Sequence, residues 1–196
     1  MRRIAAVFLA VILAACSSST SFDAASPVDA HRIAPAVRVV DYEVVVPRDL
    51  TTSEAHLYYP LVDIVWREDA PGDRHAQVEA IFDSALSWGL AAFNRGRAVR
   101  VQVQVQKFHA LSQKARYSVG GVHTIRFSLV VVDARTNGAL YGPVEVDADL
   151  IALGGARAIA AEQAGVTQKR RITQHLAGTV QKILLEAGMG LAREPG

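Results

Sequence analysis

The sequence predicts an α+β domain, a two-layer sandwich in which a mainly antiparallel sheet carries two amphipathic helices on one face. Residues 99–106 alternate valine with polar residues, which is typical of a strand that is buried on one face only. Residues 74–94 and 167–187 repeat apolar side chains at spacings of three and four, as amphipathic helices do. Because an antiparallel sheet with one polar face must bury the other, we expect both helices to cover that second face.

The first half of the domain contains two predicted strands and the first helix. Residues 36–46 are rich in valine and lie between two prolines, and residues 61–66 form a second short β-like segment. A proline and a glycine follow that segment, and Asp73 is suited to cap the N-terminus of the helix over residues 74–94. Gly96 supplies the expected stop of this helix.

The second half contains a hairpin and the last helix. We expect strands over residues 123–132 and 144–150, joined by a turn in which the pair 137–138, Asn-Gly, supplies positive φ. Thr167 is suited to cap the last helix, and Gly188 is its expected end. The predicted order of the whole domain is β-β-α-β-β-β-α.

The N-terminus has the pattern of an export signal. Arg2 and Arg3 form a basic segment, and residues 4–15 carry no charged or hydrogen-bonding side chain. An apolar segment this short does not cross a hydrocarbon core, which needs roughly 20 residues. Leu13-Ala14-Ala15-Cys16 resembles a bacterial lipobox, so we expect a lipoprotein signal peptide over residues 1–15. An ordinary cleaved signal with an incidental cysteine is the alternative.

The lipobox resemblance implies a lipid anchor. In this family of signals the cysteine, here Cys16, receives a diacylglycerol on its thiol, becomes the mature N-terminus and carries acyl chains such as palmitate. Ser17 follows, and the resemblance then implies the periplasmic face of the outer membrane, since an Asp at this place tends to retain such proteins at the inner membrane. Residues 16–35 are rich in Ser, Ala and Pro, which is typical of a flexible tether. Residues 36–190 then form a single periplasmic domain.

Composition excludes some function classes. Removal of Arg2 and Arg3 with the signal leaves 19 basic residues against 19 acidic ones, so the mature protein has no formal net charge. Nucleic-acid binding requires a basic face, and we therefore expect no nucleic-acid partner. Cys16 is the only cysteine, so an intramolecular disulfide is impossible and packing must supply the stability.

The strongest candidate for catalysis is an acidic strand. Glu145, Asp147 and Asp149 alternate along the last predicted strand, and carboxylates on one face can bind a cation or act as acid and base. The simpler interpretation is a solvated sheet face whose carboxylates pair with Arg100 or Arg126. The nucleophile-elbow, P-loop and dinucleotide-binding glycine patterns do not occur. We therefore expect a protein that is not an enzyme.

Metal and cofactor sites are also not indicated. The six histidines are scattered and show neither the HxH nor the HExxH spacing. Residues 133–138 faintly resemble a calcium loop, but Arg135 occupies a ligand position. His175 lies on the apolar stripe of the last helix and is expected to be a satisfied core histidine. The basic residues 169–171 fall in the first turn of that helix, where a solvated face is expected and contact with an anionic headgroup or partner is the alternative.

The polar face of the sheet is the candidate contact surface. It consists of Arg100, Gln102, Gln104, Gln106 and Arg126, which lie between the apolar residues of two predicted strands. An uncovered sheet edge is a second candidate for contact with a protein.

The order of elements resembles a group of periplasmic lipoproteins. This group includes the auxiliary lipoproteins of lipid-transport ABC systems, the lipopolysaccharide-assembly lipoprotein and the periplasmic domain of the curli secretion lipoprotein. The segments that carry the closest resemblance, to the transport auxiliary component, are 74–94, 99–108, 123–150 and 167–187. The opening segments 47–50 and 63–67 are more similar to an uncharacterised group of alphaproteobacterial lipoproteins. Only Cys16 matches a functional residue of these families.

Three functions follow as hypotheses. The resemblance implies a non-catalytic binding or scaffolding component of an envelope transport or assembly complex, held in the membrane by acylated Cys16 and bound to a protein partner. A lipid-binding or lipid-carrier module, with a groove between sheet and helices, is the first alternative. A hydrolase that uses the acidic strand is the second.

Overall fold

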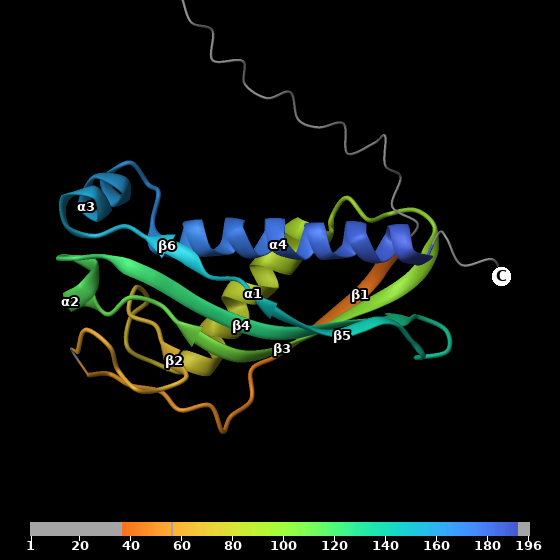
Figure 1. The fold of residues 1–196 in the computed structure, drawn as a ribbon, viewed down its shortest axis with the longest axis horizontal. Coiled ribbons are helices and arrows are strands. Elements are labelled where there is room, and N and C mark those ends of the chain that lie inside the picture. The colour runs from red at the N-terminus through yellow and green to blue at the C-terminus, as the bar shows by residue number, and fades with distance from the viewer. Residues whose placement is uncertain (1–36, 56, 192–196) are drawn as a thin grey trace, which may run out of the picture.

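The computed structural model describes residues 37–55 and 57–191. In chain order the elements are β1 (Val37–Val45), β2 (Ile64–Val65), α1 (Arg74–Leu90), β3 (Arg97–His109), α2 (Gln113–Arg116), β4 (Gly121–Asp133), β5 (Ala139–Asp147), β6 (Leu150–Ala152), α3 (Gly155–Gln163) and α4 (Gln168–Leu191). This is an α+β fold, and it contains the predicted β-β-α-β-β-β-α order with α2, β6 and α3 in addition. Figure 1 shows α4 on one side of the sheet and the segment that precedes β2 on the other.

Strand β3 is the centre of the sheet, whose order is β1-β3-β4-β5. Strands β3, β4 and β5 are antiparallel neighbours, as predicted. The short strands β2 and β6 extend the two edges, because β2 pairs with the end of β3 and β6 with the start of β4. Both β1 and β2 run parallel to β3, since α1 carries the chain back across one face of the sheet before β3 begins.

The alternation in β3 places its valines in the core. Val99, Val101, Val103 and Val105 are buried, whereas Gln102, Gln104 and Gln106 between them are exposed. In β4 the odd-numbered residues from Ile125 to Val131 face the same side. Over β3 and β4, one face of the sheet is therefore apolar, as the sequence predicts.

Helices α1 and α4 cover this apolar face. Val78, Ile81, Phe82, Ala85 and Leu86 form the buried stripe of α1, and Ile172, Leu176, Val180 and Leu184 form that of α4. Both predicted caps are present. The Asp73 side chain accepts a hydrogen bond from the backbone of Ala76, and the Thr167 hydroxyl accepts one from Arg170.

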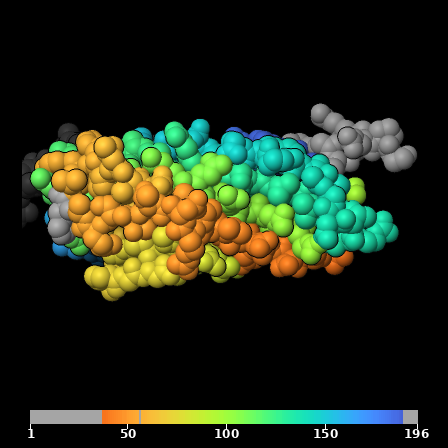
Figure 2. Space-filling view, turned by 90° about the horizontal axis from the view of Figure 1, so that it is seen from below, coloured from red at the N-terminus to blue at the C-terminus, as the bar shows by residue number. Residues whose placement is uncertain are grey.

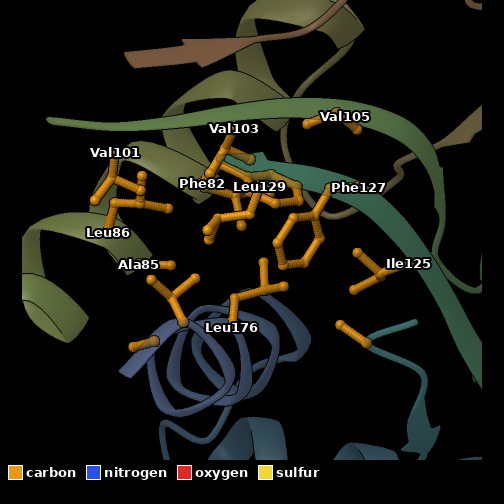
Figure 3. Packing of buried hydrophobic residues seen from close by; sticks show 14 of the residues in the cluster. Phe82, Ala85, Leu86, Val101, Val103, Val105, Ile125, Phe127, Leu129 and Leu176 are labelled. Carbon is orange, nitrogen blue, oxygen red and sulfur yellow. The ribbon is translucent and has the colours of Figure 1, made fainter. Parts of the chain in front are cut away.

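Aromatic side chains fill the space between the two layers. Phe82 of α1 makes edge-to-face contacts with Phe108 and Phe127 at centroid distances of 6.2 and 5.4 Å, and Trp66 contacts Phe108 at 5.8 Å. Leu176 of α4 points toward the side chains that β3 and β4 contribute (Figure 3). All of these residues are fully buried, so close packing supplies the main stabilising contribution of the core.

Two predicted helix ends are wrong. Helix α1 ends at Leu90 and not at Asn94, because the chain turns there to bury Phe93, whose carbonyl accepts a hydrogen bond from Val39 at 2.9 Å. Helix α4 continues past Gly188 to Leu191. A glycine weakens a helix without stopping it, and Ala187 just before Gly188 is buried.

The hairpin also departs from its predicted bounds. Strand β5 begins at Ala139 and ends at Asp147, and β6 follows after a break at residues 148–149. The break arises because the Asp149 carboxylate, and not a backbone carbonyl, accepts the hydrogen bond of the Ile125 N–H at 3.1 Å. The predicted positive φ in the turn is confirmed, since Asn137 has φ 59°.

The close approach of α1 and α4 gives a test of this packing. A Cβ on Gly89 of α1 would lie 2.6 Å from the Ala177 carbonyl oxygen, whereas nothing lies within 4 Å of a Cβ on Gly178 of α4. We expect Gly89→Ala to lower the free energy of unfolding by about 1–3 kcal/mol. The matched Gly178→Ala should raise it by about 0.5–1 kcal/mol. Urea denaturation measures both, and an equal change in the two variants would contradict the close helix contact.

Candidate functional site

The candidate site is the sheet face that the helices leave uncovered, which we call the open face. The alternation in β3 produces it, because the residues between the buried valines point away from the helices. Strand register brings neighbours from β1, β4 and β5 alongside them. Three cross-strand rows of the open face are Asp41–Arg100–Val132, Glu43–Gln102–Val130 and Val45–Gln104–Ser128–Glu145.

The structure brings the predicted contact residues together on this face. Arg100 is half-buried, and Gln102, Gln104, Gln106 and Arg126 are exposed. The sequence pattern missed Lys107, because uninterrupted alternation would turn it toward the core. A bulge between Val105 and Lys107 instead leaves Gln106 unpaired and sets Lys107 opposite Arg126 on the open face.

Amide and basic side chains pair with carboxylates across the open face. Gln102 Nε2 donates to Glu43 Oε2 at 3.3 Å, and Gln106 Nε2 donates to Glu145 Oε2 at 2.5 Å. Arg126 Nε pairs with Asp147 Oδ1 at 2.7 Å. Exposed pairs of this kind contribute only ~0–1 kcal/mol each. The side chains can therefore exchange these partners for those of another protein at little cost.

The open face is hollowed along the β1–β3–β4 strands. One hollow of about 560 Å³ is lined chiefly by Asp41, Glu43, Arg100 and Gln102. The next, of about 320 Å³, shares Glu43 and Gln102 and extends to Pro143. Figure 2 shows the molecule from this side, with the segment before β2 at one end and the β4–β5 hairpin at the other. The first hollow is lined mainly by polar side chains and the second by polar and apolar side chains in similar measure, a mixture that suits contact with a protein surface.

The segment before β2 forms a wall at one end of the open face. A third hollow of about 460 Å³ lies between this segment, at Tyr59 and Leu61, and the Lys107 and His109 side chains of β3. Asp63 fastens the base of the wall. Its carboxylate accepts hydrogen bonds from the Thr51 hydroxyl at 2.6 Å and the Thr51 N–H at 2.9 Å, and these bonds lower the pKa of Asp63.

A carboxylate between two arginines clamps the same segment to α1. Glu54 Oε1 and Oε2 accept from the Arg74 guanidinium at 2.7 and 3.1 Å, and Arg67 pairs with the same carboxylate. Both arginine side chains are largely buried, and burial lowers the pKa of each. Arg74 also donates to the Asp69 and Ala70 carbonyls at 3.2 Å. The clamp therefore fixes the wall relative to the start of α1.

The acidic strand is not a cluster of free carboxylates. Glu145 and Asp147 accept from Gln106 and Arg126, as described above, and Asp149 caps the backbone of Ile125. The interpretation of a solvated face that pairs with an arginine holds for Asp147, which pairs with Arg126, whereas Glu145 accepts from the Gln106 amide and pairs with neither Arg100 nor Arg126 in the part of the chain that the structure describes. Asp149 lies outside β5 and serves the backbone instead.

In the 133–138 turn, the Asp133 carboxylate that a calcium site would need already accepts hydrogen bonds from neighbouring groups. Hydrogen bonds from the Thr136 N–H, the Arg97 guanidinium and the Arg135 N–H hold the pKa of Asp133 well below its ordinary value. Among residues 37–55 and 57–191, no group of three or more His, Cys, Asp or Glu side chains is placed to hold a metal ion.

A buried polar cluster lies where α2, β4, α3 and α4 meet, and no sequence pattern indicates it. Arg116 pairs with Glu68 at 3.1 Å and Glu162 at 2.6 Å. A cavity of about 10 Å³ lies beside Arg116, His123 and Gln168. His123 Nδ1 and Gln168 Nε2 are buried there without a hydrogen-bond partner in the part of the chain that the structure describes. The cavity has room for about one water molecule. The cluster escaped prediction because its members come from segments far apart in the sequence.

The last helix contains two departures from expectation. His175 is half-buried, but its Nε2 finds no hydrogen-bond partner among the residues described, so it is not a satisfied core histidine.

In the basic segment 169–171 only Arg170 is exposed. Lys169 Nζ pairs with Asp69 at 2.9 Å, and the Arg171 guanidinium donates to the Ile151 carbonyl. The carboxylate of Glu68 accepts from the Lys169 N–H and supplies the negative charge that a helix N-terminus favours.

The anchoring residue lies elsewhere. Cys16, together with the predicted signal and tether, falls outside the residues that the structure describes. Within those residues, no helix combines the length and the apolar character that a membrane span requires.

Comparison with known proteins identifies a family. The model of a family of unknown function, DUF6778, matches residues 37–194. None of the curated proteins matches the chain. A crystal structure of a "putative lipoprotein" from Caulobacter crescentus CB15 is 16% identical with a TM-score of 0.36, and the match covers 85% of this chain and 98% of that one. A crystal structure of a Xanthomonas campestris protein of family DUF330 is 10% identical with a TM-score of 0.47, with coverages of 82% and 92%.

The similarity to these two crystal structures carries no information about function. At such TM-scores and identities they show neither a shared site nor a shared activity. The resemblance to lipid-transport and lipopolysaccharide-assembly lipoproteins therefore stays a prediction.

The buried polar cluster predicts that the free energy of unfolding depends on pH through His123. Burial, with the nearby charges of Arg171 and Arg116, lowers the pKa of His123 to about 3, whereas an unfolded histidine has a pKa of about 6.5. Between these values the unfolded chain binds the extra proton, so the contribution of His123 to stability is present above about pH 6.5 and is lost as the pH falls. We expect His123→Gln to flatten the slope of unfolding free energy in this window by up to about 1.4 kcal/mol per pH unit. Urea denaturation at a series of pH values measures the slope. An unchanged slope would show that His123 titrates normally in the folded protein.

Proposed function

The chain belongs to the DUF6778 family, whose description assigns no function, and we propose one from the residues themselves. We propose that the protein is a membrane-anchored lipoprotein that binds a protein partner in the cell envelope and does not catalyse a reaction. Its place would be the periplasmic face of the outer membrane, where it would serve as a binding or scaffolding component of a transport or assembly complex.

The observation that carries the proposal is the open face. It spans β1, β3, β4 and β5 without a covering helix, and it presents amides and ion pairs around two adjoining hollows. A protein interface is on the whole about as polar as the rest of the surface, so this character fits a binding face. Half-buried Arg100 lines the larger of these two hollows. Arginine is enriched at protein interfaces because its planar group forms several hydrogen bonds at once.

The edge strand β1 adds a second means of contact. Phe93 and Asn94 pair with the outer edge of β1 at Val39 and Arg38. From Val40 to Val45 the outer edge of β1 has no strand beside it in the described part of the chain. An extended segment of a partner can add to such an edge through backbone hydrogen bonds, with its side chains over the open face.

Anchoring is supported by the sequence alone. The basic and apolar leader ends in Leu13-Ala14-Ala15-Cys16, and a thioether-linked diacylglycerol there would hold the domain at a membrane surface. Ser17, which follows Cys16, supports the proposed location at the outer membrane, because lipoproteins retained at the inner membrane tend to have an Asp at this place.

The two alternatives have less support. A lipid carrier needs an apolar groove between sheet and helices, but Phe82, Phe108, Phe127 and Trp66 fill that space. A hydrolase on the acidic strand needs a carboxylate free to act, whereas Glu145 and Asp147 are paired with side chains of the open face.

Site-specific cross-linking tests the proposal. A photoreactive amino acid in place of Gln104, which is exposed on the open face, should give a covalent adduct with one protein when cells are irradiated. The same amino acid in place of Gln174, which is exposed on α4, should give none. Immunoblots and mass spectrometry identify the adduct.

A further variant separates a specific contact from a chance collision. Gln102→Arg should abolish the adduct at position 104, because it replaces a neutral amide beside Arg100 with a second cation. A surface change of this kind alters stability by about 0.5 kcal/mol or less, so the fold remains. No adduct at 104, or the same adduct at 104 and 174, would contradict binding through the open face.

A further inference from the structure

Large apolar side chains are exposed at one end of the domain. Leu61 is 99% exposed, Tyr59 77%, Ile151 75% and Val119 72%. Leu57 and Val122 are about half exposed, and Val122 pairs with Ile151 across β4 and β6. The loop before β2, α2 and β6 lie at the same end of the molecule (Figure 1). We call these six residues the apolar tip, and exposure on this scale indicates a contact surface.

We propose that the apolar tip inserts into the surface of the lipid bilayer in which the chain is anchored. This inference rests on the proposed lipidation of Cys16, and it assigns the domain a second membrane contact.

The shape of the tip favours a fluid partner. Leu61 has nearly its whole surface in water, so no groove of this domain receives it, and the most exposed residues stand on separate loops and a strand. Acyl chains adapt to such projecting side chains, whereas a protein would need matching pockets. Tyrosine is typical of the membrane–water interface, and Tyr59 adjoins Leu61 along the chain.

Charge at this end points to anionic headgroups. Lys107 lines the hollow beside Tyr59 and Leu61, and Lys114 Nζ lies 4.5 Å from the ring centroid of Tyr58. Neither lysine has a carboxylate partner in the part of the chain that the structure describes.

Three acidic groups of this end already have partners. Glu54 is held by Arg67 and Arg74, and Glu162 is held by Arg116. Asp63 accepts its hydrogen bonds from Thr51. The two lysines are thus left for phosphates, with their alkyl stems along the apolar surface.

The length of the chain before β1 permits this contact. Val37 pairs with Arg97 at the start of β3, and β2 pairs with its end, so the tip and Val37 are separated by the 13 residues of β3. At about 3.3 Å per residue this distance is about 43 Å. The segment 17–36 has a greatest reach of about 70 Å, which spans the distance back to the anchored Cys16. The open face then stands at the side of the domain, free for its protein partner.

The single cysteine makes the test direct. Thioether formation would consume the Cys16 thiol, so an environment-sensitive fluorophore on Leu61→Cys would report the tip alone. The matched control is Arg135→Cys, which is exposed in the hairpin at the opposite end. Each full-length lipoprotein is reconstituted into vesicles of phosphatidylethanolamine and phosphatidylglycerol, some of them brominated in the acyl chains. Mass spectrometry of Cys16 establishes its lipid independently.

The inference predicts a blue shift and loss of most of the fluorescence in brominated vesicles for the label at 61, and neither effect at 135. The pair Tyr59→Asp with Val119→Asp should restore the fluorescence at 61. Emission at 61 that stays red and unquenched overturns the inference. A blue shift without quenching also overturns it, because a protein or a second copy then covers the tip. In either case a lipid on Cys16 leaves the proposed anchoring intact. A Cys16 without lipid overturns both.

Discussion

The sheet buries one face against helices and exposes the other, and this asymmetry determines both the core and the outer surface of the domain. The valines of β3 and the odd-numbered residues of β4 need an apolar cover, and α1 and α4 provide it with two apolar stripes. Because both helices occupy that side, every residue between the valines faces outward. The polar open face, its ion pairs and its hollows therefore follow from the same alternation that builds the core.

Features with a local period or a local cap could be predicted from the sequence. The alternation at 99–106, the stripe of α1 and the Asp73 cap are of this kind. Helix α3 buries only Ala158, so it has no apolar stripe to detect. The bulge at Gln106 has no signal in an unbroken valine repeat. The Glu54 clamp and the cluster around Arg116 join distant segments, and a single sequence does not show which segments meet.

The domain divides its surface between two kinds of contact. The open face is polar and paired, and its side chains can exchange one set of hydrogen bonds for another. Tyr59 and Leu61 of the apolar tip project from the segment before β2, which the Glu54 clamp and the Thr51–Asp63 hydrogen bonds hold in place. The clamp matters for both, since it fixes the wall whose Tyr59 and Leu61 belong to the tip and also line the hollow beside Lys107. With this arrangement the domain can bind a protein through the open face while its apolar tip contacts a membrane.

The central claim is that the open face is free in the isolated protein and covered in the envelope. The reaction rate of a single thiol, Gln104→Cys, with a membrane-impermeant maleimide tests this directly, because the native Cys16 would carry lipid. We expect rapid modification of the purified lipoprotein and strong protection of the same thiol in outer-membrane fragments whose periplasmic face is open to the reagent. Equal rates in the two preparations would contradict it.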